Sequence, residues 1–446
     1  MALDQRLEGS DVTAIASLVE RSAELKRELL EFSWQPRFDR ERREVLRDHL
    51  ADRFVGDEAE VITALDYFLL QHELRSGKTV VERFVASRPD LPKHERELLL
   101  GWRDVVEGIF EVRGRDGDAL VVENLVDELT YRVYSNMGRG VFQPLESGGF
   151  VIGRLVPLGP EWLISGNFAC YPKSDRVAIH RTACEMAMRY PKWAFRNPDK
   201  LARARQQQSA EHDRFVQFFG ADFLVIPGAQ LTERMRSFYT FCRDQVEAEL
   251  AASGKRPKHE PFNGPDYPAD LVASDAVAVT HDEVDGLGLY AEFGMIEEAF
   301  ADPGLLRHPD YRRRVRDYLD DPTISPVLFE RMAARDPERT NQMFRKLLGR
   351  KHFDWAMGGE KLMRQRKPDY FNQPRLPCIV PLSDKLAAYA ASASGAVRWR
   401  PCPRRTGVVQ RNAAARPGVL PGLGSTPRPS QTCSLMFDAP SPIGTH

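Results

Sequence analysis

The densest group of side chains capable of chemistry is His281, Asp282, Glu283 and Asp285, which places one imidazole and three carboxylates within five residues. These groups are ligands for divalent metals and suit general acid–base catalysis. A metal-dependent, hydrolase-like enzyme that uses this acidic tip is therefore one functional hypothesis. Neighbouring residues on a strand point to opposite faces, however, and solvated turns are commonly acidic. We therefore favour a solvated turn, and we assign no metal ligand and no cofactor.

A second candidate is the basic stretch that contains Arg312, Arg313, Arg314 and Arg316, with a tyrosine on either side. Arginines interleaved with aromatic residues can grip a phosphate backbone, which makes nucleic-acid binding a further hypothesis. Nearby aspartates offset this charge, and pairs of opposite charge stabilise an exposed helix face. We favour a solvated, ion-paired helix over a nucleic-acid site.

A third candidate is a set of aromatic and basic side chains in a region with strand periodicity. Leu129, Tyr131 and Val133 alternate with more polar neighbours, as in a half-buried strand. We expect four side chains of this region to be exposed and to contact a partner, although the aromatic ones could instead belong to the core: Tyr131, Arg132, Tyr134 and Arg154.

The elements that must position these residues fall into helical and strand-rich regions. Asp116-Gly117 is a strong hairpin turn signal between two apolar runs, and Gly159-Pro160 marks a second turn. Five short strands with tight connections predict an antiparallel meander or small barrel at residues 108–168. The acidic tip lies between Ala276–Thr280 and Leu287–Tyr290, which we expect to pair as a hairpin.

Helical periodicity and proline content define the rest of the chain. In chain order we expect an N-terminal helical region, a second helical region, a proline-rich linker, and a region with a hairpin and short helices: 1–107, 169–252, 253–270 and 271–390.

The last segment, residues 391–446, differs in composition from everything before it. It holds eight prolines, six glycines and seven arginines, but no lysine and one acidic residue. No part of it has helical or strand periodicity, so we expect a disordered tail. Two explanations remain open: a basic arm, or an out-of-frame reading of a GC-rich gene that replaced the natural C-terminus.

Part of the strand-rich region resembles a segment of uncharacterised bacterial proteins, some of which end in a SEC-C motif, a short cysteine-rich zinc-binding segment. The resemblance covers about sixty residues and rests on Phe110–Val112, Phe150–Leu158 and Trp162–Gly166. Pro401-Cys402-Pro403 is similar to the opening of a SEC-C segment, but the second cysteine, the Gly-Ser-Gly turn and the closing ligands are missing. The resemblance therefore implies a bacterial origin; no metal ligand is carried over from it, and no activity follows from it.

Composition excludes several classes of protein and identifies none. The 63 basic and 64 acidic residues give a net charge of −1, which offers no whole-chain argument for nucleic acid or a membrane surface. The acidic start Met1–Glu8 lacks a basic region and an apolar stretch, so we expect a cytoplasmic, soluble protein. Walker, dinucleotide-binding, nucleophile-elbow, HExxH and kinase motifs are all absent from the sequence.

We therefore expect an α+β fold, predominantly helical, with an embedded small antiparallel β meander or barrel and a disordered C-terminal tail. The leading hypothesis is a non-catalytic binding or adaptor protein with a protein partner, because grooves and edge strands of β modules commonly serve recognition.

Overall fold

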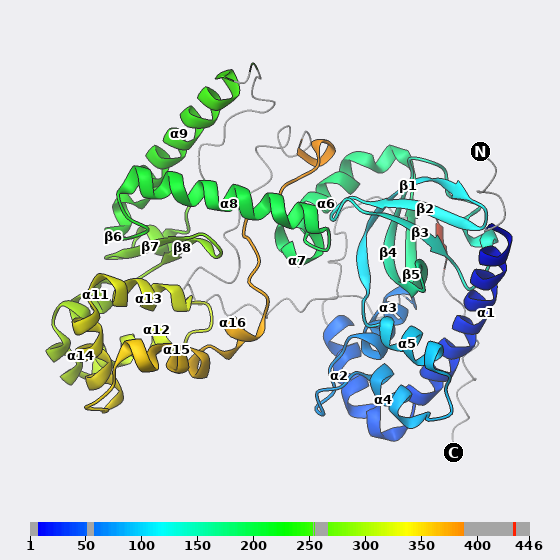
Figure 1. Cartoon of the computed structure of the whole chain (residues 1–446), viewed down its shortest axis with the longest axis horizontal. Coiled ribbons are helices and arrows are strands. Elements are labelled where there is room, and N and C mark those ends of the chain that lie inside the picture. Colours follow the sequence, from blue (N-terminus) through cyan, green and yellow to red (C-terminus); the bar gives the residue numbers. More distant parts are fainter. Residues whose placement is uncertain (1–7, 51–57, 253, 255–265, 388–430, 434–446) are drawn as a thin grey trace. The chain divides into compact units, whose positions relative to one another are not determined.

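The computed structural model describes residues 8–50, 58–252, 254, 266–387 and 431–433 (Figure 1). Helices account for 59% of the structure and strands for 16%, which confirms the predicted α+β class. The chain divides into two units. The first contains the described residues up to Met186 together with residues 431–433, and the second begins at Ala187.

The first unit begins with five α-helices and one short 3-10 helix. Their bounds are α1 Glu8–Ser33, η1 Pro36–Phe38, α2 Asp39–Leu50, α3 Glu58–Leu70, α4 Val80–Ser87 and α5 Lys93–Gly101. The start of α4 is fixed by a capping box, in which the Thr79 hydroxyl accepts from the Glu82 backbone N–H and the Glu82 carboxylate accepts from the Thr79 N–H. The apolar stripes of these helices meet in one core that includes Leu25, Phe68 and Trp102.

A closed five-stranded barrel follows the helices. Its strands are β1 Val106–Asp116, β2 Ala119–Asn124, β3 Thr130–Tyr134, β4 Phe150–Leu158 and β5 Glu161–Tyr171. The order is β3-β2-β1-β4-β5, the neighbouring strands in this order are antiparallel, and a short parallel pairing of β3 with β5 closes the barrel. The predicted turns are both present, since Gly117 and Gly159 adopt φ of +60° and +63°, in the left-handed region that favours glycine.

Alternation along the strands separates the inside of the barrel from its outer face. Phe110, Leu155 and Phe168 belong to the barrel core, whereas Val156 and Leu158 on β4 pack with the N-terminal helices instead. One outer face of the barrel is therefore covered by helices of the same unit. Two 3-10 helices also belong to this unit, η2 Arg139–Phe142 and η3 Lys173–Asp175, and the boundary between the units falls near the end of the helix α6 Arg176–Arg189.

The second unit contains a three-stranded antiparallel sheet in the order β6-β7-β8, with strands Phe223–Ile226, Val277–Asp282 and Gly286–Tyr290. Val277 and Val279 join one apolar cluster, and Ala278 between them joins another. Because successive side chains point to opposite faces, both faces of this sheet are buried. The first cluster draws on α8 and α9, and the second draws on α11 to α15.

Prolines set the starts of several helices in this unit, since α12, α13, α14 and α16 each begin with one. The helices are α7 Pro191–Ala194, α8 Pro198–Phe219, α9 Gly228–Ala252, α10 Ala269–Val272, α11 Gly294–Ala301, η4 Pro303–Arg307, α12 Pro309–Asp320, α13 Pro326–Arg335, α14 Pro337–Leu348, α15 Trp355–Arg366 and α16 Pro368–Asn372.

Two predicted segments lie mainly outside the described residues. Most of the predicted linker 253–270 is not described, and its last residues open the short helix α10. In the predicted disordered tail 391–446, the structure describes Gln431–Cys433 alone, which form a short strand, β9.

Candidate functional site

The C-terminal half of β5 is the open edge of the barrel. Its N-terminal half pairs with β3 through Trp162 and Leu163. In its C-terminal half, Ala169–Tyr171 pair with β4 on one side, and Phe168–Cys170 pair with the added strand β9 on the other. β9 is antiparallel and places Thr432 opposite Ala169. This stretch of β5 therefore accepts a strand that is remote in sequence.

A bulge in β5 creates this edge. Pairing with β4 shifts register between Arg154↔Ser165 and Ile152↔Ala169, which leaves extra residues on β5. Gly166 lies in the bulge with φ of +72°, and a Cβ there would approach the Asp66 Cβ to 3.3 Å. Bulges bend a strand and end its regular pairing. The bend separates the second half of β5 from β3 and leaves its backbone groups available.

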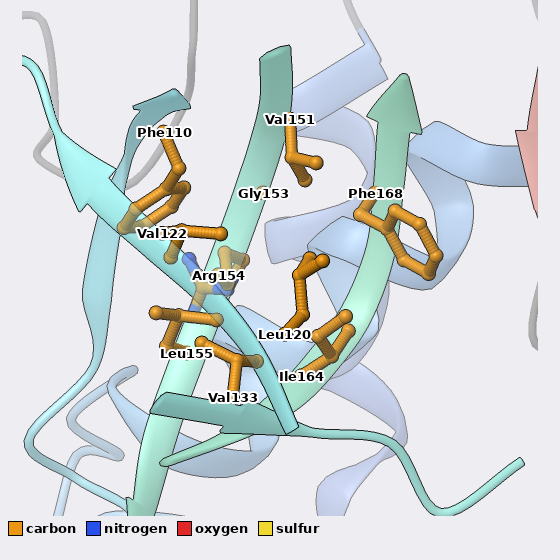
Figure 2. Close-up of a pocket in the computed structure, with 10 residues that line it drawn as sticks. All are labelled: Phe110, Leu120, Val122, Val133, Val151, Gly153, Arg154, Leu155, Ile164 and Phe168. Carbon is orange, nitrogen blue, oxygen red and sulfur yellow. The ribbon is translucent and has the colours of Figure 1, made fainter. Parts of the chain in front are cut away.

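The interior of the barrel offers no room for a ligand. Ten residues line a cavity of about 10 Å³, and apolar side chains among them, such as Phe110, Leu155 and Phe168, fill the centre of the barrel (Figure 2). That volume is at the lower limit for one water molecule. Binding by this module must therefore use its outer surface or its edge.

The four side chains predicted to be exposed on this module occupy different environments. Tyr131 is 3% exposed, and its hydroxyl donates to Asp127 over 2.7 Å. Arg132 is paired with Asp116 and with Glu161, and Tyr134 is half-buried against the N-terminal helical core. The prediction of exposure is wrong for Tyr131, because its ring faces the barrel core with Phe110 and Trp162.

Arg154 was also expected on the surface and is instead 1% exposed. Its Nε lies 2.9 Å from Asp66 on α3, and its other nitrogens reach Glu107 over 3.3 Å and Gln71 over 2.6 Å. The outer face of β4 is covered by the N-terminal helices, so the outward-facing side chain of Arg154 is buried rather than exposed to solvent. The prediction of an exposed Arg154 is therefore wrong.

The carboxylate of Asp66 connects this arginine to α1. Lys26 Nζ lies 2.6 Å from Asp66 Oδ1, and the Ser165 hydroxyl donates to the same oxygen over 2.7 Å. Burial alone would raise the pKa of Asp66, but the charges of Lys26 and Arg154 outweigh it and lower that pKa to about 2. This network fastens α1 and α3 to β4 and β5.

The sequence analysis did not predict this network, although both its acidic and its basic residue stand out in the sequence. Asp66 interrupts the apolar run Val61–Leu70, and Arg154 interrupts the apolar run of β4. A charged residue within a buried run requires a partner of opposite charge. Pairing these two interruptions would have predicted that α3 packs on β4.

The acidic tip between β7 and β8 does not converge on a common point. His281 is 1% exposed, and its Nε2 lies 3.8 Å from Glu211, whereas the side chain of Glu283 is 64% exposed. Asp282 caps the turn by accepting from the backbone N–H groups of Val284 and Asp285. Within residues 8–387 as described, no three histidine, cysteine, aspartate or glutamate side chains are grouped so as to hold a metal ion.

Asp282 and Asp285 instead bind segments that are distant in sequence. Arg375 lies 3.0 Å from Asp282 and 3.3 Å from Asp285, and Arg331 lies 3.3 Å from Asp282. The buried carboxylate of Asp285 also accepts from Ser325 and from Tyr370, both over 2.9 Å. These contacts hold α13 and the segment after α16 against the hairpin.

The four arginines of the predicted nucleic-acid stretch do not form one cationic surface. Arg312 donates to the Leu306 carbonyl over 3.1 Å, Arg313 pairs with Asp310 over 2.7 Å, and Arg314 pairs with Glu292 over 2.5 Å. Arg316 lines a surface hollow. Three of the four are thus engaged within the unit, as expected for an ion-paired helix face.

No helix in the described part of the chain combines the length and apolar character needed to cross a membrane. Comparison with known proteins finds no matching family model, no matching curated protein and no matching solved structure. The resemblance to proteins that end in a SEC-C motif stays a prediction.

Proposed function

We propose that the chain is a non-catalytic binding protein of the bacterial cytoplasm whose barrel binds an extended polypeptide segment along the edge of β5 at Phe168–Cys170. The observation that carries the proposal is the antiparallel pairing of β9 with this edge. In strand addition, main-chain hydrogen bonds supply affinity, and alternate side chains supply selectivity.

The side chains along the edge suit such a ligand. Phe168 and Cys170 point into the barrel core, while the small side chain of Ala169 lies on the other face and is half-exposed. Directly opposed side chains on neighbouring strands contact each other, so the residue that faces Ala169 has room to be large. We therefore expect a preference for a bulky residue at that central position of the ligand.

The edge is short, which predicts weak binding of an isolated peptide. Each hydrogen bond contributes about 1 kcal/mol net, and a three-residue pairing supplies only a few. A Kd on the order of 1–10 mM is expected for a short peptide that lacks further contacts. A partner that binds more tightly must add contacts outside the three paired residues.

The test uses the full chain with Gln431 and Thr432 both replaced by proline. Successive N–H groups along a strand point to opposite edges, so the double substitution removes at least one N–H group that bonds to β5, whichever of the two residues faces that strand. A labelled peptide of residues 428–436 should then bind to the variant at least about tenfold more tightly than to the unmodified chain, because the internal strand no longer competes.

Fluorescence anisotropy measures both affinities. The matched control is the same peptide with proline at the positions of Gln431 and Thr432, which should bind to neither protein. Equal affinity of the unmodified peptide for both proteins, or binding of the proline peptide, would contradict the proposal.

A further inference from the structure

A surface hollow of about 370 Å³ lies in the second unit, where the last turns of α12, α14 and α15 meet. Three arginines and one aspartate contribute its charged lining: Arg316, Arg350, Arg366 and Asp320. Three leucines of α12 and α14 complete it. The volume falls within the range of sites for small ligands.

The arginines of this hollow are unequal in their contacts. Arg366 lies 2.9 Å from Asp320, which neutralises one guanidinium. Within the part of the chain that the structure describes, Arg316 and Arg350 make no side-chain hydrogen bond or ion pair, unlike Arg312, Arg313 and Arg314 on α12. Three guanidiniums and one carboxylate leave the lining with a net charge of +2.

Basic residues near helix C-termini often serve the helix itself, by offsetting its dipole or bonding its last carbonyls. Here other groups take that role. The Gly349 and Arg350 backbone N–H groups both donate to the Arg345 carbonyl at the end of α14. The Lys367 ammonium donates to the Tyr318 and Asp321 carbonyls at the end of α12, over 3.1 and 2.6 Å. The guanidiniums of Arg316 and Arg350 are therefore available to a ligand.

We propose that this hollow binds a compact phosphate-bearing anion of the size of inorganic phosphate or pyrophosphate. Guanidinium groups match the oxygens of phosphate in paired hydrogen bonds, and a ligand with two or more negative charges balances the net charge of the lining. Arg316 and Arg350 hold the anion, and the paired Arg366 supplies a third donor at the rim. This inference is independent of the binding proposed for β5.

Isothermal titration calorimetry of the full chain with pyrophosphate, and separately with inorganic phosphate, at fixed low ionic strength tests the site. Arg316→Gln and Arg350→Gln should each weaken binding at least about tenfold, since each removes one charge-assisted contact. Arg313→Gln is the matched control, because it removes an equal charge from the same helix, where Arg313 is exposed and paired with Asp310. That variant should bind as the unmodified protein does.

Three results would overturn the proposal. Equal weakening by all three variants would mean that the anions respond only to the general charge of the surface. An absence of heat with both anions would mean that the hollow holds no phosphate. Binding of a single-stranded oligonucleotide without binding of either small anion would assign the arginines to a polymer instead.

Discussion

Replacement of Asp66 by asparagine should destabilise the first unit strongly, because it removes one partner from a buried charge network. The Asp66 side chain is 2% exposed and is held by Lys26 at 2.6 Å and Arg154 at 2.9 Å. Asparagine keeps the shape but leaves two cations with the single carboxylate of Glu107, 3.3 Å from Arg154. Removing one partner of a buried pair costs about 3–5 kcal/mol. Since Glu107 remains, we expect about 3 kcal/mol.

Hydrogen exchange resolved by mass spectrometry measures this effect within the first unit. A loss of about 3 kcal/mol corresponds to roughly hundredfold faster exchange of the most protected amides in β1 and β4. Asp90→Asn is the control, because Asp90 is exposed and its partner Arg88 is also on the surface. If Asp66→Asn changes exchange no more than Asp90→Asn does, the network does not fasten the helices to the barrel and the reasoning is wrong.

Three further predictions follow from buried charges. The pKa of Asp66 is lowered to about 2, below its usual value near 4. The stabilisation that Asp66 contributes should therefore be present above pH 4 and be lost as the pH falls from 4 to 2. The same acid dependence of unfolding in Asp66→Asn would contradict this. Burial lowers the pKa of Lys367 to about 8, so the folded protein binds fewer protons than the unfolded chain between about pH 8 and 10. The free energy of unfolding, measured with urea, should therefore rise with pH in that window. The rise should be smaller in Lys367→Met. Asp285→Ala leaves the Tyr370 and Ser325 hydroxyls without this acceptor and leaves Arg375 with Asp282 alone. The change should cost about 2 kcal/mol and speed tryptic cleavage after Arg375, whereas Glu283→Gln on the exposed side of the same turn should leave cleavage unchanged.

Local signals predicted the strands of the barrel well. The alternation at Leu129–Val133 and the turns at Gly117 and Gly159 act between neighbours in sequence, and each is present in the structure. The sequence did not predict whether the strands close into a barrel, because a meander and a barrel both fitted the pattern. The decisive contact is the parallel pairing of Val133 with Trp162, which joins residues far apart in sequence and leaves no local pattern.

Charged residues were harder to place, because their environment depends on distant partners. Arg154 occupies an outward position on β4, and a strand pattern cannot tell whether that face meets water or the helices. The acidic tip was also placed incorrectly, since residues expected to face solvent contact a distant segment. Asp282 and Asp285 were expected in a solvated turn, but their partner Arg375 lies about ninety residues later in the chain.

Backbone hydrogen exchange at Phe168–Cys170 tests the central claim most directly. Addition of the peptide of residues 428–436 to the chain with prolines at positions 431 and 432 should slow exchange at the edge of β5. Amides of Leu120–Val122 on β2 should not change, because that strand already pairs with β1 and β3. Slower exchange confined to β5 is the predicted result, and unchanged exchange at Phe168–Cys170 under saturating peptide would contradict the account.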